Sequence, residues 1–433
     1  MEHHTSASPH AHWTDSTAPD SMGPNSSDAY GPSTMMSEAQ SQPSGHMMRP
    51  DDPDNPQNWP VHKKLYTSAV ATAYGFVVAF GATAYVVGIP GVMAHFNVSM
   101  TKAILPFSLF FWGIMFAPVW VPHLSERVGR QLQYPILIFI FALFTLGASF
   151  SQSFAALSIC RFFAGFFGGP ALVLIEGTYA DVWSADYTVT YYAGLTLASF
   201  LGTASGPLVT GFLYAFGGWR WTLWITLILT LPALLFGVAM PETYGREILR
   251  RRARRNGQPI KLAKAASGVT FSEMAQLTVI DPIKMAITEP IVIGLSLYVG
   301  LIFALIFQFF VAIPVVLSLT YNFTIQQAGI AFTSAIAGTL LAAATAATIE
   351  TLTRPRGDSI GAQNATRPLE WRMLPALLGG PLIMGSLFWI AWTASPTTHF
   401  LVPIFGTMVF IWGSFMVLVG SRFASLQLPE RMY

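Results

Sequence analysis

Long apolar runs alternate with short polar segments along most of the chain. A helix needs about 20 apolar residues to cross the hydrocarbon core of a bilayer, and ten runs are that long. We expect membrane-spanning helices at residues 65–90, 103–121, 134–151, 155–179, 191–214, 219–240, 289–318, 326–349, 373–394 and 399–420. The pattern predicts an all-α integral membrane protein.

The longest polar segments divide the chain. Residues 241–288, which hold five arginines between Arg250 and Arg255, separate six spans (63–240) from four (289–420). This predicts two helical halves joined by a basic cytoplasmic linker, the usual plan of secondary transporters. Residues 1–62 lack apolar periodicity, which predicts a disordered cytoplasmic tail that ends with Trp59 near the membrane interface. Residues 421–433 are expected to form a second cytoplasmic tail.

Composition supports a membrane protein and narrows its chemistry. The 433 residues are 53% hydrophobic and 10% charged, whereas soluble domains average about 25% charged residues. The chain has no phosphate-binding loop, zinc-ligand spacing or serine-hydrolase elbow. These absences weaken the interpretations of an ATP-driven pump and of a membrane protease. We expect a protein that is not an enzyme and uses no cofactor, metal or nucleic acid, and we also expect a monomer. Cys160 is the single cysteine, so no intrachain disulfide is possible.

The basic residues indicate which end of each span faces the cytoplasm. With a cytoplasmic N-terminus, all of the 23 Lys and Arg residues except Lys102, Arg161 and Arg220 fall on cytoplasmic segments, as the positive-inside rule requires. Asn97 and Asn322 begin Asn-x-Ser/Thr sequences that are candidates for glycosylation, and both fall in loops on the opposite side. Such short sequences also arise by chance.

Two charged residues fall inside the fourth span. An ionisable side chain inside a membrane is costly and marks a functional site by default, so Arg161 is a candidate functional residue. A carboxyl group buried there would have a raised pKa, so Glu176 is a candidate for carrying a proton. At 1.5 Å per residue they lie about 22 Å apart, too far to form a pair. The alternatives are that Arg161 reaches the outer interface and that Glu176 reaches cytoplasmic water.

The fifth span contains an unusual glycine and proline stretch, formed by Gly202, Gly206, Pro207 and Gly211. These residues weaken a helix in water, but a membrane tolerates them, and small residues four apart let helix backbones approach closely. The stretch fits a bent helix with a close-packing face, as a moving half of a transporter needs. The alternative is that the small residues only pack neighbouring helices together.

The loop between the second and third spans carries Glu126, Arg127, Gly129 and Arg130. Gly129 permits a tight turn. Glu126 can pair with Arg127, with Arg130 or with a helix N-terminus of the other half. Such a pair would latch one conformation of a transporter; the alternative is a solvated loop of positive-inside residues.

These sequences resemble motifs of the major facilitator superfamily, in the loop between spans 2 and 3, in span 4 and in span 5. The matching residues are Glu126, Gly129, Arg130, Arg161, Gly165, Gly202, Gly206, Pro207 and Gly211, and the departures are Pro122, Gln131 and Thr210. The resemblance implies two helical halves around a central path and proton coupling through Arg161. The span 5 motif implies export of a substrate in exchange for protons.

The borders of the sixth span indicate a group within the family. Gly218-Trp219-Arg220-Trp221 and Met240-Pro241-Glu242-Thr243-Tyr244 are similar to fungal 12-span drug:proton antiporters. Because that group has twelve spans, we expect a chain truncated after span 10, with an incomplete second half. A partner that supplies the missing helices, a non-transporting receptor and an inactive truncated product are the alternatives.

Aromatic and polar residues of the seventh span are candidates for lining a substrate cavity: Tyr298, Phe307 and Gln308. The same face could meet lipid instead. Val311 stands where the family often has an acidic residue, which disfavours a cationic polyamine. We expect proton-coupled export of amphipathic organic molecules, such as drugs, toxins or secondary metabolites, across the plasma membrane. A vacuolar location and polyamine:proton exchange are the alternatives.

Overall fold

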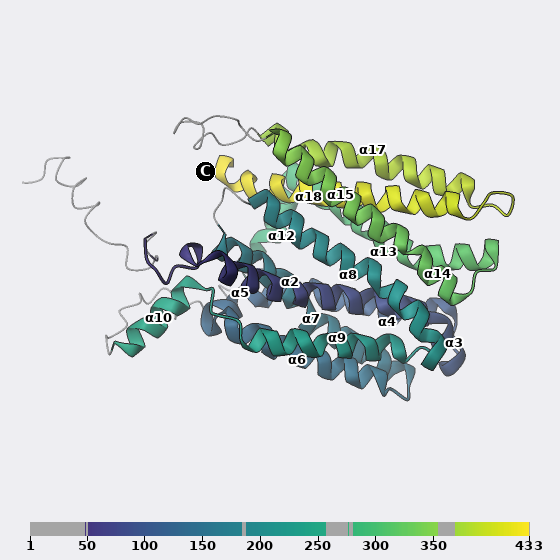
Figure 1. Cartoon of the computed structure of the whole chain (residues 1–433), viewed down its shortest axis with the longest axis horizontal. Coiled ribbons are helices and arrows are strands. Elements are labelled where there is room, and N and C mark those ends of the chain that lie inside the picture. Colours follow the sequence, from purple (N-terminus) through teal and green to yellow (C-terminus); the bar gives the residue numbers. More distant parts are fainter. Residues whose placement is uncertain are drawn as a thin grey trace, which may run out of the picture. The chain divides into compact units, whose positions relative to one another are not determined.

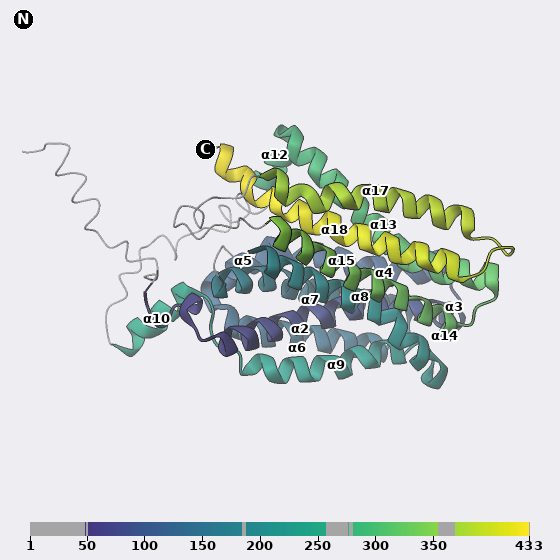
Figure 2. The same cartoon turned by 45° about the horizontal axis from the view of Figure 1, so that its top comes forward.

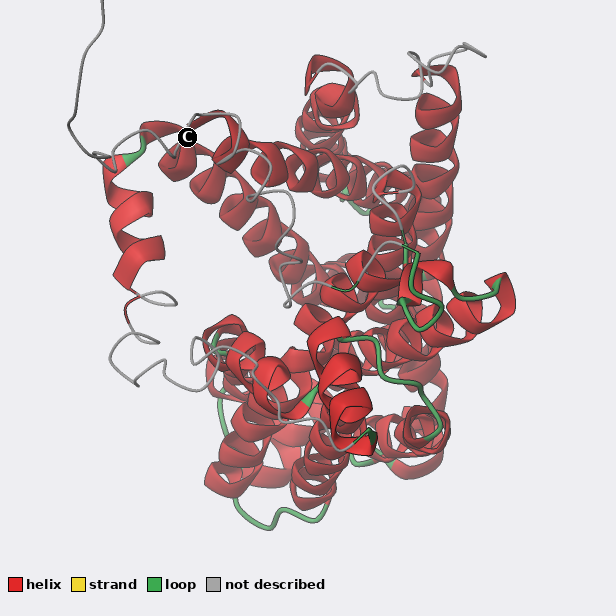
Figure 3. Cartoon of the chain, turned by 90° about the vertical axis from the view of Figure 1, so that its left-hand side faces the viewer, coloured by secondary structure: helices red, strands yellow, loops and turns green. Residues whose placement is uncertain are grey.

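The computed structural model describes residues 48, 51–183, 188–256, 276, 280–353 and 369–432. All regular elements in these ranges are helices (Figure 3). Ten of its helical stretches are long and apolar enough to span a membrane, which confirms the predicted number for the described residues. They are Val61–Phe96, Met100–Pro122, Arg130–Ser149, Phe154–Val182, Thr196–Gly217, Trp221–Val238, Val292–Tyr321, Ile325–Leu352, Met373–Thr393 and Leu401–Ser421.

The helices follow one another with short connections in most places. In chain order they are η1 (Pro56–Asn58), α2 (Val61–Ala84), η2 (Tyr85–Gly88), α3 (Ile89–Phe96), α4 (Met100–Met115), α5 (Ala117–Val128), α6 (Arg130–Ser149), α7 (Phe154–Val182), α8 (Thr188–Gly217), α9 (Trp221–Val238), α10 (Gly245–Arg255), α12 (Asp281–Thr288), α13 (Pro290–Tyr321), α14 (Ile325–Ala331), α15 (Thr333–Thr353), α17 (Leu369–Thr393) and α18 (Leu401–Met432).

We call α2 to α9 the first half and α13 to α18 the second half. In the first half, α2 packs against α7, α8 and α9, while α7 packs against α4 and α6. In the second half, α18 packs against α15 and α17. The helix α8 also contacts α14, α15 and α18, so it is the main link between the halves. Helix α10 lies at one end of the bundle and α3 at the other, and we call these the α10 end and the α3 end (Figures 1 and 2).

The first helices of the two halves differ in burial. In the most apolar stretch of α2, 78% of the residues are buried, whereas in that of α13 only 28% are buried. Both helices are apolar around most of their circumference, and such a helix is covered either by protein or by lipid. Much of α13 is therefore left to lipid in this arrangement.

Several spans are broken in places that hydropathy does not predict. The α-helix α2 ends at Ala84 and the 3-10 turn η2 follows, before α3 begins with Pro90 in its first turn. The eighth span is divided at Phe332 into α14 and α15. A membrane-spanning helix tolerates such interruptions where neighbouring helices satisfy the freed backbone groups.

The segment before α2 packs against protein. Trp59 is buried, and the Lys63 ammonium lies 3.6 Å from its ring centroid. Arg252 of α10 binds both carboxylate oxygens of Asp52 at 2.8 Å and also bonds to Asp54. Hydrogen bonds to these two carboxylates raise the pKa of Arg252 further above its ordinary value. Trp59 thus packs against protein, and its position near the membrane interface stays a prediction.

The structure describes most of the predicted C-terminal tail but little of the predicted N-terminal tail. The predicted disorder of residues 1–47 lies outside the described residues, as do residues 257–275 of the predicted linker. At the other terminus, α18 continues as a helix to Met432, past the expected end at residue 420.

Candidate functional site

A cavity of about 340 Å³, which we call the central cavity, lies where the two halves meet. Its walls come from α2, α4, α5, α7 and α8 of the first half and from α13 and α18 of the second. The lining residues are Val78, Ala79, Ala82, Phe111, Ile114, Pro118, Leu172, Val173, Glu176, Thr196, Ser199, Phe200, Thr203, Phe303, Ile306, Phe307, Phe310 and Leu418.

The chemistry of this lining is mostly apolar with a few polar groups. Glu176 is the only ionisable side chain among the lining residues, and Thr196, Ser199 and Thr203 supply hydroxyl groups from α8. Small-molecule sites typically combine an apolar wall with a few convergent polar groups in a volume of about 300–1,000 Å³. The central cavity has the size and chemistry for an amphipathic organic molecule.

The three residues predicted on the seventh span lie in different places. Phe307 lines the central cavity, and its ring centroid lies 3.9 Å from that of Phe111 on α4. Gln308 is exposed on the bundle surface and Tyr298 is 41% exposed, and neither belongs to the cavity lining. The structure therefore brings one of the three candidates to the cavity.

Arg161 is buried inside the first half, with 1% of its surface exposed. Its Nη1 donates to the Gly81 carbonyl at 3.0 Å, and its Nη2 donates to the Ala82 carbonyl at 3.2 Å. The guanidinium carbon also lies 4.3 Å from the Phe110 ring centroid and 5.2 Å from that of Tyr85. Burial of this depth shows that the interpretation of an arginine reaching the outer interface is wrong.

The carbonyls of Gly81 and Ala82 lie in the last turn of α2, where Arg161 supplies hydrogen-bond donors to them. The last four carbonyl groups of an α-helix have no partner within the helix, and Gly81 and Ala82 fall among them because α2 ends at Ala84. A cation is also favoured at the negative end of the helix dipole. Arg161 therefore caps the α-helical part of α2, and because Ala82 lines the central cavity, it supports the cavity wall.

Glu176 lies on α7 about four turns from Arg161, and the two face different surroundings. Glu176 is half-buried and lines the central cavity together with Leu172 and Val173 of the same helix. Its predicted place towards the end of α7 that approaches α10 agrees with the helix bounds. A carboxyl group in such a cavity inside a span is a candidate for binding a proton.

The loop motif forms a charge cluster at the α10 end. Gly129 connects α5 to α6 with φ of 80°, a conformation that favours glycine. Arg130 follows and forms an ion pair with Asp181 of α7, with Nη1 and Oδ2 2.8 Å apart. The backbone N–H of Arg130 donates to Glu242 Oε1 at 2.9 Å. The helix N-terminus of α6 thus receives a carboxylate, as its dipole favours.

Helix α10 is fixed to the same cluster. Arg251 bonds to Glu242 Oε2 at 3.3 Å, to Glu247 Oε1 at 3.2 Å and to Gln131 Oε1 at 2.6 Å. The predicted partner Glu126 and its neighbour Arg127 lie in α5, and their side chains are outside the described part of the structure.

Sequence reasoning did not find the two carboxylates that hold Arg130. Asp181 and Glu242 lie far from the loop in sequence, so only the fold reveals the contact. The one available signal was the Pro241-Glu242-Thr243-Tyr244 sequence after the sixth span, which places an acidic residue shortly before the arginine-rich sequence of Arg250 to Arg255.

The glycine stretch of α8 faces α2. A Cβ on Gly202 would lie 2.6 Å from the Phe76 carbonyl oxygen, and one on Gly206 would lie 2.9 Å from the Ala84 nitrogen. The Thr83 hydroxyl adds a bond across this contact, because it donates to the Thr203 carbonyl at 2.8 Å. Side chains at these two positions would therefore separate the backbones of α8 and α2.

Gly211, on the same helix, faces the second half instead. A Cβ there would lie 3.0 Å from Cα of Gly329 on α14, and a Cβ on Gly329 would lie 3.0 Å from the Pro207 carbonyl oxygen. The stretch thus joins two close contacts, one within the first half and one between the halves near the α3 end.

The two glycosylation candidates are both exposed at helix ends. Asn97 ends α3 with φ of 49° and Asn322 ends α13 with φ of 55°, a left-handed conformation that asparagine tolerates better than most residues. Thr324, the third residue of the second sequence, caps α14 through Gln327. Both asparagines lie at the α3 end, and the local backbone accounts for their residue type.

Comparison with known proteins identifies a family and several relatives of this chain. A model of the Major Facilitator Superfamily matches residues 72–429. Polyamine transporter 4 of Saccharomyces cerevisiae is 30% identical over 395 residues, which cover 85% of this chain and 60% of that protein. The cycloheximide resistance protein of Candida maltosa is 29% identical over 384 residues, which cover 85% of this chain and 68% of that protein. The chain thus spans about two thirds of the length of these relatives.

A solved structure shows the same fold. The human organic anion transporter MFSD10 superposes with a TM-score of 0.58 over 84% of this chain and 86% of that protein, at 16% sequence identity. The family model covers most of the chain, and all ten candidate spans overlap the matched residues. We conclude that this chain belongs to the Major Facilitator Superfamily.

Proposed function

We propose that the protein is a proton-coupled exporter of neutral or amphipathic organic molecules. The observation that supports this most strongly is the central cavity, whose walls come from both halves and whose lining is apolar except for Glu176 and three hydroxyl groups. A compound with an apolar body and a hydrogen-bonding group fits such a lining. Movement of one half against the other would expose the cavity to each side of the membrane in turn.

In this proposal Glu176 carries the proton. Its carboxyl group lines the cavity that holds the substrate, so a proton and the hydrogen-bonding group of a substrate compete for the same carboxylate. Uptake of a proton from outside would release the substrate there, and loss of that proton to the cytoplasm would prepare the cavity for the next molecule. Arg161 acts as a positioning residue, since it holds the end of α2 that forms the opposite wall.

The proposed orientation places the α10 end in the cytoplasm. Arg246, Arg254 and Arg255 of α10 are exposed at this end, and basic residues gather on the cytoplasmic side of membrane proteins. Asn97 and Asn322 then lie on the outer side, where glycosylation occurs. We propose the plasma membrane as the location.

A polyamine:proton antiporter is the second candidate, because one relative is named as a polyamine transporter. A polyamine carries several positive charges, and buried charges need partners of opposite sign. The described lining of the central cavity offers one carboxylate, Glu176. The structure therefore favours a substrate with at most one positive charge.

Transport by purified protein in sealed lipid vesicles tests both candidates. The probes are radiolabelled cycloheximide, which is neutral, and spermidine, each with and without an imposed proton gradient. We expect gradient-driven movement of cycloheximide and not of spermidine, with loss of the gradient dependence in the Glu176→Gln variant. The Glu289→Gln variant is the matched control, because Glu289 lies outside the cavity lining.

The outcomes separate the alternatives. Movement of spermidine instead of cycloheximide would support the polyamine antiporter. Binding of cycloheximide without movement would support a receptor. Unchanged gradient dependence in Glu176→Gln would remove Glu176 from the proton pathway while leaving export itself intact.

A further inference from the structure

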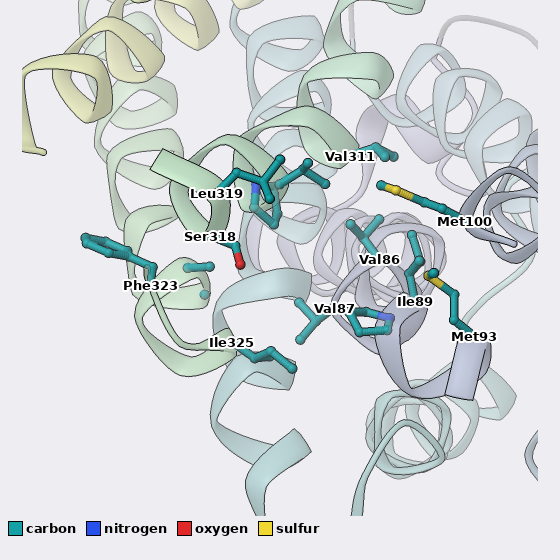
Figure 4. Close-up of a pocket in the computed structure, with 15 residues that line it drawn as sticks. Val86, Val87, Ile89, Met93, Met100, Val311, Ser318, Leu319, Phe323 and Ile325 are labelled. Atoms are coloured by element: carbon teal, nitrogen blue, oxygen red, sulfur yellow. The ribbon is translucent and has the colours of Figure 1, made fainter. Parts of the chain in front are cut away.

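A second cavity, which we call the α3-end pocket, has a volume of about 200 Å³. Its walls come from both halves, and Figure 4 shows side chains of the two halves facing each other across it. Its lining includes Val86, Met93 and Met100 from the first half and Ser318, Leu319 and Phe323 from the second.

The α3-end pocket is separate from the central cavity. The two linings share no residue. On α13, Phe307 lines the central cavity, and Val311, one helical turn further on, lines the α3-end pocket. The rings of Phe307 and Phe111 pack with centroids 3.9 Å apart, and Phe107 joins them. This aromatic contact lies at the boundary between the two cavities.

The chemistry of the two cavities also differs. The α3-end pocket has no ionisable side chain in its lining, and Ser318 is its only hydroxyl group. An ion would have no partner there, and burying an unpaired charge is costly. Met93 and Met100 offer sulfur atoms, which contact aromatic rings favourably. The lining therefore selects neutral molecules and suits an aromatic ring.

The volume limits the size of such a molecule. An apolar protein cavity of about 150 Å³ binds benzene, so a pocket of about 200 Å³ holds one ring with a small substituent. Ser318 and Leu319 are exposed, which places the opening of the pocket beside them and the hydroxyl group at that opening.

We propose that the α3-end pocket is a second ligand site, for small neutral organic molecules built around a single ring and carrying one hydrogen-bonding group that the Ser318 hydroxyl binds. A molecule there touches both halves beside the Gly211–Gly329 contact. It would resist any movement that separates the halves at this end, and so would slow transport without competing for the central cavity. This consequence depends on the proposed transport function, whereas binding itself does not.

Photolabelling of the purified full chain in lipid nanodiscs tests the site. The probe is benzyl alcohol that carries a photoreactive trifluoromethyl-diazirine on its ring, and excess benzyl alcohol is the competitor. Peptide mass spectrometry locates the label. We expect label that the competitor displaces on Met93 and on residues 311–323. Label on lipid-facing residues is not displaced and serves as background.

Two neighbouring valines of α13 provide a matched pair of variants. Val315 lines the pocket and Val316 does not. Val315→Phe fills the pocket and should reduce displaceable labelling by about tenfold or more, while Val316→Phe should leave it unchanged. Ser199→Phe, which fills the central cavity instead, should also leave it unchanged. Equal melting temperatures of the variants show that each is folded.

A variant at the opening tests the hydroxyl group separately. Ser318→Ala should weaken competition by benzyl alcohol and leave competition by toluene unchanged, because toluene has no hydrogen-bonding group. The proposal is overturned if the competitor displaces no label in the pocket, if Val315→Phe and Val316→Phe label equally, or if displaceable label maps to the central cavity alone. Each result can be read whether or not the protein exports any compound.

Discussion

At Arg161 a buried positive charge meets the end of a helix instead of a carboxylate. The two carbonyls that it binds belong to the last turn of α2, and two aromatic rings cover its guanidinium. An arginine suits this position because its planar fork presents parallel donors, which a lysine ammonium cannot match. The residue therefore has a structural task that is independent of any role in proton coupling.

The structural task makes a prediction about stability. Arg161→Ala removes the charged donor that binds the Gly81 and Ala82 carbonyls, and hydrogen bonds to charged groups contribute about 1.5–3 kcal/mol each. We expect a clearly lower melting temperature of the purified protein, with a smaller decrease for Arg161→Lys. Arg254→Ala on the exposed face of α10 is the control and should melt as the unaltered protein does. If Arg161→Ala lost pH-driven transport at an unchanged melting temperature, coupling would be its only role.

At the scale of the helices, α8 shows how one short sequence sets two interfaces. Gly202 and Gly206 allow the backbone of α2 to lie close to α8, while Gly211 allows that of α14 of the other half to do so. Glycine normally weakens a helix by about 0.5–1 kcal/mol relative to alanine, so its use here is explained by the close approach of neighbouring backbones. Gly194, on the same helix, has no described neighbour within 4 Å of where its Cβ would lie, apart from its own helix backbone and its two chain neighbours.

This difference predicts opposite effects of the same substitution along α8. Gly206→Ala places a methyl group against the backbone of α2, and overpacking of this kind costs about 1–3 kcal/mol. Gly194→Ala meets open space and should stabilise the helix slightly through its better helix propensity. Thermal unfolding of the two variants measures the contrast. Equal melting temperatures would show that the contact between α8 and α2 does not depend on the glycine.

The helices also show what the sequence can and cannot reveal. The ten spans follow from runs of about 20 apolar residues, because bilayer thickness alone fixes that length. The break after Ala84 and the division at Phe332 depend on packing against other helices, to which hydropathy is blind. The candidate site shows the same limit: the apolar run marks Arg161 as unusual, whereas its partners, and those of Arg130, lie in distant segments.

At the scale of the whole molecule, the contact between Gly211 and Gly329 holds the two halves together near the α3 end. It is the place where the first half's glycine stretch meets the second half directly, backbone against backbone. It also borders the α3-end pocket, since Gly329 belongs to the lining. A transporter that exposes its central cavity to this side must open the contact.

Gly329→Ala should therefore shift the balance between closed and open arrangements of the α3 end. Its methyl group would lie 3.0 Å from Cα of Gly211 and from the Pro207 carbonyl oxygen. An overpacking energy of about 1–3 kcal/mol corresponds to a shift of about 5- to 150-fold towards the open arrangement.

The reactivity of a cysteine placed at Val86, which is buried in the α3-end pocket, measures this opening. With Cys160 replaced by serine, a water-soluble maleimide should label Val86→Cys faster when Gly329→Ala is present. Gly385→Ala on α17 is the matched control, because no described side chain or neighbouring helix approaches within 4 Å of its Cβ position, its two chain neighbours apart. If Gly329→Ala and Gly385→Ala gave equal labelling rates, the glycine contact would not be what keeps the α3 end closed.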